Sequence, residues 1–316
     1  MFKVWFWLTV LFATPVYAIE KPPTAIEWLT QMQHSMQSLN YQGTVVFFKN
    51  NKLDSMSYFH AVNKGQEQEY LLSLNSPMRE ILRNEGNVSC IFKDSKKVEI
   101  NHLPNNRSFI IDLPENFQHQ AAYYEFELKN QAKVAGLTAQ VIVIKPKDEL
   151  RYLRKIWVDQ QHFIPLKAEV YNHAGAIIEQ VMFTELKVKK NLPFVSLNIV
   201  SDHLKVKHIH QSHLQTRDQS KFVINNIPQG FEEVFFMQMK MHGSNQAVEH
   251  LLLSDGFSSV SIYQEISEEM IPAGIQSAGS INSLVKKIKG FQFVVIGDVP
   301  VKTIQLIAEG IRLKTP

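Results

Sequence analysis

Four histidines lie close together in the sequence, between residues 203 and 213. His208 and His210 are two residues apart, so on a β-strand both imidazoles would lie on one face and could chelate zinc or copper. His203 and His213 flank this pair. No cysteine or carboxylate cluster accompanies them, which favours a solvated polar linker. A third interpretation is a pH sensor, because clustered imidazoles titrate near about pH 6. Metal binding and pH sensing both stay open, and we assign no metal ligand.

Catalytic chemistry has little support in the sequence. Cys90 is the only cysteine, which excludes an intrachain disulfide, and a lone thiol within a strand pattern is typical of a small buried hydrophobe. The sequence contains no G-x-G-x-x-G, P-loop, H-E-x-x-H or G-x-S-x-G motif. The interpretation as a secreted hydrolase is therefore without a nucleophile–base motif to support it. We predict a protein that is not an enzyme and has no cofactor.

Several predicted strands are apolar on both faces, including Val45–Phe48 and Val141–Ile144. A sheet that covers one helix needs only one apolar face, so the second face needs another layer or lines a cavity. A doubly covered sheet is one interpretation, and a pocket for acyl chains is the other. Strand alternation does not tell which face is concave. The residues predicted to line a lipid pocket are Val46, Phe48, Leu72, Ile142, Trp157 and Val170.

The mature chain is predicted to begin with a helix and continue as a sheet. Thr24 and Glu27 form a capping box, and the apolar stripe that follows ends near Leu39-Asn40. From there to about residue 185, about nine turn-bounded strands predict an antiparallel sheet, curled or closed. We expect residues 19–190 to form one domain.

A basic segment and a second module follow. Residues 191–218 are predicted to be a linker, with a strand near Leu204–Ile209, that contacts an acidic partner segment or anionic lipid headgroups. Residues 219–316 are nearly neutral and are predicted to form a small α+β domain. Its last helix runs from Pro300 to Glu309, with Gly310 as the cap.

The N-terminal segment resembles an export signal. A positive charge at Lys3, an apolar run and the small-x-small site Val16-Tyr-Ala18 predict a signal peptide over residues 1–18. The apolar run is too short for a membrane anchor. The 316 residues suggest about two domains, and the formal net charge of +3 is too small for a general nucleic-acid binder. We expect an exported protein that does not bind nucleic acid.

Short motifs spread over the mature chain resemble those of one known family. In the first domain they are Ser38-Leu-Asn-Tyr41, Pro77-x-Arg79-Glu80, Ile156-Trp-Val-Asp159 followed by Pro165, and Leu192-Pro193. In the second module they are Ile227-Pro-Gln-Gly-Phe231, Leu253-Ser-Asp-Gly-Phe257-Ser258 and Ile296-Gly-Asp-Val-Pro300. Together with the signal peptide, their order and spacing resemble the RseB/MucB family of periplasmic sigma-E regulators.

The resemblance implies a fold and a role. It implies an α+β protein with a curved antiparallel sheet, a half-barrel similar to lipoprotein carriers, and a smaller C-terminal domain that binds the partner. It also implies a periplasmic negative regulator that binds the periplasmic region of a membrane anti-sigma factor and shields it from proteolysis. Lipid or lipopolysaccharide fragments would release it. The alternative is a lipid or lipoprotein carrier, which would not need residues 219–316. A homo-oligomer is left open.

Overall fold

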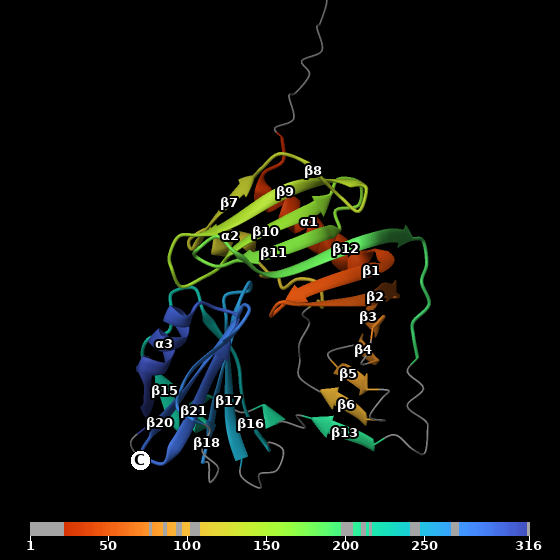
Figure 1. The fold of residues 1–316 in the computed structure, drawn as a ribbon. Coiled ribbons are helices and arrows are strands. Elements are labelled where there is room, and N and C mark those ends of the chain that lie inside the picture. The colour runs from red at the N-terminus through yellow and green to blue at the C-terminus, as the bar shows by residue number, and fades with distance from the viewer. Residues whose placement is uncertain are drawn as a thin grey trace, which may run out of the picture.

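The computed structural model describes residues 22–75, 78–84, 87–92, 97–101, 108–196, 205–209, 213–214, 217–240, 247–266 and 272–314. Two large, mostly antiparallel sheets and few helices make up the described chain, which confirms the predicted α+β class (Figure 1). The predicted signal peptide, with His203 and His210, lies outside the described residues. No helix among the described residues is long and apolar enough to cross a membrane.

The first sheet is curved and has thirteen strands (Figure 1). Its main path runs β13-β6-β5-β4-β3-β2-β1-β12-β11-β10-β9-β7, and β8 pairs with β9. All pairs are antiparallel except β13 with β6. The strands are β1 (Asn40–Lys49), β2 (Lys52–Asn63), β3 (Gln66–Ser73), β4 (Arg79–Asn84), β5 (Asn87–Phe92), β6 (Lys97–Asn101), β7 (Tyr124–Leu128), β8 (Ala132–Val134), β9 (Leu137–Pro146), β10 (Leu153–Asp159), β11 (Pro165–Tyr171), β12 (Ile177–Lys189) and β13 (Lys205–Ile209).

The second sheet has seven strands in the order β14-β16-β17-β18-β21-β20-β19. They are β14 (His213–Leu214), β16 (Glu232–Lys240), β17 (Ala247–Ser254), β18 (Ser259–Glu265), β19 (Gly274–Ala278), β20 (Ile281–Ile288) and β21 (Phe291–Gly297). Helix α3 (Val301–Gly310) and the pair β15 (Phe222–Ile224) with β22 (Ile311–Leu313) pack on one side of it and close its core. The helix ends one residue later than predicted, so Ile311 and not Gly310 is the cap.

Helix α1 (Ala25–Ser38) begins where the capping box predicts. The Thr24 backbone N–H donates to Glu27 at 2.6 Å, and the Glu27 N–H donates to the Thr24 hydroxyl at 3.3 Å. Its buried stripe, which includes Leu29 and Met32, packs on Ile142 and other residues of one face of the first sheet. We call this the inner face. The short helix α2 (Phe117–Gln120) joins the same core.

The segment predicted to be a linker contributes a strand to each sheet. β13 extends the first sheet beside β6, and β14 pairs with β16 in the second. Before β13, the Gln68 side chain exchanges two hydrogen bonds with the Val195 backbone, of 2.6 and 3.2 Å. The strand expected near Leu204–Ile209 is therefore confirmed as β13. The domain boundaries at residues 190 and 218 stay predictions.

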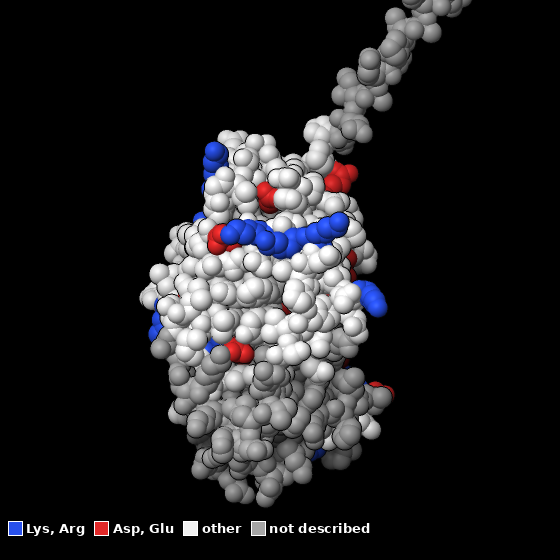
Figure 2. All heavy atoms as spheres, turned by 90° about the vertical axis from the view of Figure 1, so that its right-hand side faces the viewer, with Lys and Arg blue, Asp and Glu red and all other residues white. Residues whose placement is uncertain are grey.

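Basic side chains gather where β12 ends. β12 runs to Lys189, past the predicted end of the sheet near residue 185, and Lys187, Lys189 and Lys190 are exposed there. Figure 2 shows Lys and Arg side chains in one row across this side of the molecule, with few acidic side chains beside them. Glu185 forms an ion pair with Lys187, and Lys189 and Lys190 add two further positive charges at the end of β12.

A candidate binding site between the two sheets

A cavity of about 450 Å³ lies between the inner face of the first sheet and strands β18 and β21 of the second. Its volume is within the range of small-molecule sites. The walls combine apolar side chains with polar and charged ones. They come from β10 to β12, from residues 108–112 and from the second sheet, with Ile156, Val170, Val181, Phe109, Ile111, Phe257 and Ile296 among them.

Two cations and four carboxylates line this cavity, the carboxylates being Asp112, Glu169, Glu179 and Asp298. Lys49 lies 3.2 Å from Glu179, and Arg154 lies 3.2 Å from Asp298. Arg154 also donates to the Ser258 hydroxyl at 2.9 Å, but its Nε atom is buried without a hydrogen-bond partner in the described structure. A buried donor without a partner is costly. The cavity therefore combines apolar side chains with charged side chains of both signs.

A buried carboxylate holds one wall of the cavity in place. Glu69 accepts hydrogen bonds from the Ser108 hydroxyl at 2.5 Å and from the Phe109 backbone N–H at 3.0 Å. The same carboxylate accepts from the Tyr58 hydroxyl at 2.5 Å and from Arg83 Nε at 2.9 Å. Residues 108–112 form no helix or strand, so these bonds fix their position. We call residues 108–112 the shared wall.

His60 and Glu67 extend this buried network. Both ring nitrogens of His60 lie within hydrogen-bond distance of acceptors, the Leu39 carbonyl at 2.7 Å and the Glu67 carboxylate at 3.1 Å. Arg83 also contacts Glu67. Burial opposes ionisation of Glu67, but the hydrogen bond from His60 and the charge of Arg83 outweigh it and lower the pKa of this carboxyl.

This lowered pKa predicts a pH-dependent stability. A carboxyl whose pKa is lower in the folded than in the unfolded state stabilises the fold above its unfolded pKa, near 4.5 for Glu67. The contribution is lost as the pH falls below that value. We expect Glu67→Gln to lower the free energy of unfolding at pH 7, and the difference from wild type to shrink toward pH 3. Urea unfolding across this range measures it. A difference that stays constant would contradict the role given to Glu67.

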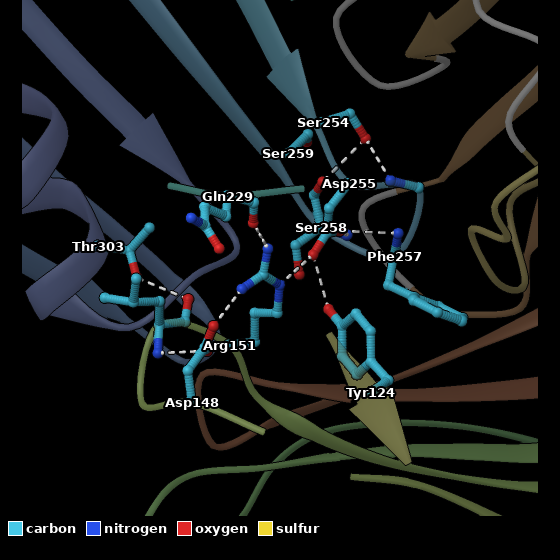
Figure 3. A network of polar contacts seen from close by, with 12 residues as sticks. Tyr124, Asp148, Arg151, Gln229, Ser254, Asp255, Phe257, Ser258, Ser259 and Thr303 are labelled. Atoms are coloured by element: carbon cyan, nitrogen blue, oxygen red, sulfur yellow. Dashed lines mark hydrogen bonds and ion pairs between the residues drawn. The ribbon is translucent and has the colours of Figure 1, made fainter. Parts of the chain in front are cut away.

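Arg151 links the two sheets from a fully buried position (Figure 3). It follows β9 and donates from Nε to Asp255 of the second sheet at 2.8 Å, and it also contacts Asp148 and the Gln229 carbonyl. The Tyr124 hydroxyl donates to the same Asp255 oxygen at 2.7 Å. Burial and the charge of Asp255 raise the pKa of Tyr124 well above its usual value, so this hydroxyl keeps its proton.

The loop that carries Asp255 inserts into the core of the first sheet. Phe257 is fully buried against Tyr124, Phe117 and Phe126, with ring centroids 5.0, 6.2 and 6.3 Å apart. Gly256 has φ +87°, and a Cβ there would lie 2.4 Å from Pro114. Only glycine allows this close approach. The two sheets are therefore docked by a buried ion pair and a shared aromatic core.

Two of the predicted lipid-pocket residues lie on the inner face. Val170 lines the cavity between the sheets. Ile142 is fully buried in the core beneath α1 and does not line the cavity.

The other four predicted residues lie on the opposite face of the first sheet. Trp157 belongs to a separate cluster with Leu166 and Met182, and Val46 pairs with Met182 in the register. Phe48 lies two residues further along the same strand, on the same face as Val46. Leu72 alternates with Leu71, which faces the inner core. None of the four lines the cavity. Whether any of the six residues contacts lipid stays a prediction.

The sequence analysis did not single out the residues that dock the sheets. Asp255 and Phe257 belong to the motif Leu253–Ser258, and Arg151 belongs to none of the motifs. This motif was the available signal, because its Gly256 allows the loop to lie against Pro114. For the histidine hypotheses, only the backbones of His208 and His213 are described, in β13 and β14. Among the described residues, no group of three or more histidine, cysteine or acidic side chains could hold a metal ion.

Two family models match this chain in sequence. The model described as the MucB/RseB N-terminal domain matches residues 24–205, and the MucB/RseB C-terminal domain model matches residues 216–312. The chain belongs to the MucB/RseB family. This confirms the resemblance from the short motifs, and the two models cover the first and the second sheet except for most of β13 and all of β14.

Named MucB and RseB proteins are similar over long stretches. Sigma-E factor regulatory protein RseB of Salmonella typhimurium is 24% identical over 99% of both chains. Sigma factor AlgU regulatory protein MucB of Pseudomonas aeruginosa is 27% identical over about half of each chain, 51% of this chain and 50% of MucB. The crystal structure of MucB in complex with MucA(peri) superposes with a TM-score of 0.73, at 21% identity, over 92% of this chain and 100% of that one. MucB therefore shares the fold of both sheets.

Proposed function

We propose that this protein is a periplasmic negative regulator of a sigma-E-type envelope-stress response. It binds the periplasmic region of a membrane anti-sigma factor and shields that region from proteolysis. The observation that carries the proposal is the match of both MucB/RseB domain models along the chain. Named relatives are regulators of sigma factors, and one MucB was crystallised with MucA(peri). The proposal assigns no catalytic step, and the predicted signal peptide supports export.

The second sheet favours a regulator over a pure lipid carrier. A carrier needs only an apolar cavity, whereas here the second sheet is docked on the first through Arg151, Asp255 and Phe257. A docked second domain adds surface for a protein partner. The proposal is tested by isothermal titration of the mature protein with the periplasmic region of the anti-sigma factor from the same organism. We expect a micromolar or tighter Kd; no binding up to about 100 µM would contradict the proposal.

We further propose that the cavity between the sheets takes the acyl chain of a lipid or lipopolysaccharide fragment. Its apolar side chains, which include Ile156, Val170 and Phe257, and the charged side chains between them support an amphiphilic ligand. Each buried CH₂ contributes about 0.8 kcal/mol, so a chain of about 12 carbons would contribute on the order of 9 kcal/mol before the costs of binding. That is comparable to the roughly 8 kcal/mol of a micromolar protein complex. A lipid could therefore compete with the partner.

Val170 and Phe48 give a matched pair of variants for this second proposal. Val170 lines the cavity and Phe48 lies on the opposite face of the same sheet. A buried carboxylate is costly, so we expect Val170→Asp to weaken binding of a fluorescent fatty acid at least about tenfold. Phe48→Asp should leave the affinity within about twofold. Circular dichroism confirms that both variants fold. Loss of binding only in Phe48→Asp would contradict the cavity and favour the outer face.

A further inference from the structure

A second, larger groove of about 1300 Å³ lies beside the cavity. One side comes from α1 and from residues 111–123 of the first domain. The other comes from the start of β16 and the loop 254–256 of the second. The groove therefore spans both sheets. Ser108, Ile111 and Asp112 of the shared wall line both the groove and the cavity.

The groove is acidic. Seven carboxylates and no lysine or arginine are among its lining residues. The carboxylates are those of Glu67, Glu69, Asp112, Glu115, Glu232, Glu233 and Asp255. Three arginines form ion pairs with four of these carboxylates. The pairs are Arg83 with Glu67 and Glu69, Arg151 with Asp255, and Arg217 with Glu233. The carboxylates outnumber these arginines, so the groove keeps a negative charge. Glu115 and Glu232 are exposed, on opposite sides of the groove.

Apolar side chains alternate with these acids. Met36, Leu113 and Phe231 line the groove, and Val234 is 54% exposed at its edge. A β-bulge between Glu233 and Phe235 leaves Val234 without a partner in β17. Val234 is therefore an apolar side chain that a bound partner could cover. The groove thus offers the exposed Val234 and the half-buried Leu113 between two acidic rims.

We propose that this groove binds a cationic amphipathic segment of the protein partner. Lysine or arginine side chains of that segment pair with Glu115 on one rim and Glu232 on the other, while an apolar side chain covers Val234. The inference rests on the proposed function, because it assigns a surface to the periplasmic region of the anti-sigma factor. Charge complementarity selects the partner, since an anionic lipid or an acidic peptide would be repelled.

The shared wall links this groove to lipid binding. Because the same residues border both spaces, a ligand that displaces the wall from Glu69 changes the groove as well. Binding of the two ligands is then coupled, and the coupling free energy is the same in both directions. A lipid that weakens partner binding tenfold would have its own affinity weakened tenfold by the partner.

The test is charge reversal on the two rims. Glu115→Lys with Glu232→Lys should raise the Kd for the anti-sigma periplasmic region about tenfold. Binding to wild type should also weaken with salt, and binding to the double variant much less. The control Glu309→Lys reverses an exposed charge on α3, outside the groove, and should leave the Kd within about twofold.

Photo-crosslinking gives an independent measurement. A benzoylphenylalanine at Val234 should crosslink to the partner, and one at the exposed Ile275 of β19 should not. Two results would overturn the groove assignment and leave the proposed function standing. One is that wild type binds the partner and the double variant has an unchanged Kd. The other is crosslinking at Ile275 alone. Failure of wild type to bind the partner would instead contradict the proposed function, and the groove assignment with it.

Discussion

Replacing Arg151 with alanine is expected to lower the free energy of unfolding by about 3–5 kcal/mol. The substitution leaves Asp255 as a buried carboxylate that keeps only neutral donors, the Tyr124 hydroxyl and the backbone N–H groups of Phe257 and Ser258. Removing one partner of a buried ion pair costs more than the pair itself contributes, because the remaining charge stays desolvated. Urea unfolding followed by circular dichroism measures the loss.

A double-mutant cycle separates the ion pair from general packing. Asp255→Asn keeps the size of the side chain and removes its charge, so adding it to Arg151→Met should recover part of the loss caused by Arg151→Met alone. A coupling energy of about 1–3 kcal/mol is expected for groups in direct contact. Additive effects, or a loss below about 1 kcal/mol for Arg151→Ala, would show that the pair does not hold the two sheets together.

Truncating Phe257 to alanine is expected to separate the two sheets. The side chain comes from the second sheet but is buried entirely in the aromatic core of the first, so its loss leaves a cavity at the docking surface. Phe→Ala in a core costs about 3–5 kcal/mol. We expect the radius of gyration from small-angle X-ray scattering to increase, and thermal unfolding to split into two transitions.

Phe236→Ala is the matched control for Phe257→Ala. Phe236 is buried within the core of the second sheet itself. Its truncation should lower the stability of that sheet by a similar amount without increasing the radius of gyration of the folded protein. If both variants keep the wild-type radius, Phe257 does not dock the sheets.

Local signals in the sequence predicted the elements that depend on neighbouring residues. The capping box of Thr24 and Glu27 placed the start of α1, since both hydrogen bonds lie within one helical turn. Turn residues placed most strands of the first sheet, because a hairpin is closed by its own turn. β7 and β8 were missed because they follow an irregular stretch without a clear alternation.

The candidate site could not be predicted in the same way, because long-range contacts form it. Arg151 meets Asp255 across 104 positions, and no local pattern marks that pair. The alternation of Val45, Val46, Phe47 and Phe48 shows two apolar faces, but only the position of α1 tells which face is the inner one. For this reason Val170 lines the cavity and Phe48 does not, although the sequence treats them alike.

The measurement that tests the central claim most directly is the rate at which the site-1 protease of the same organism cleaves the periplasmic region of the anti-sigma factor. We predict that the mature protein slows cleavage in proportion to the fraction of anti-sigma factor bound. The double variant Glu115→Lys with Glu232→Lys should need about tenfold more protein for the same protection. An unchanged cleavage rate at saturating wild-type protein would contradict the claim that this protein shields its partner.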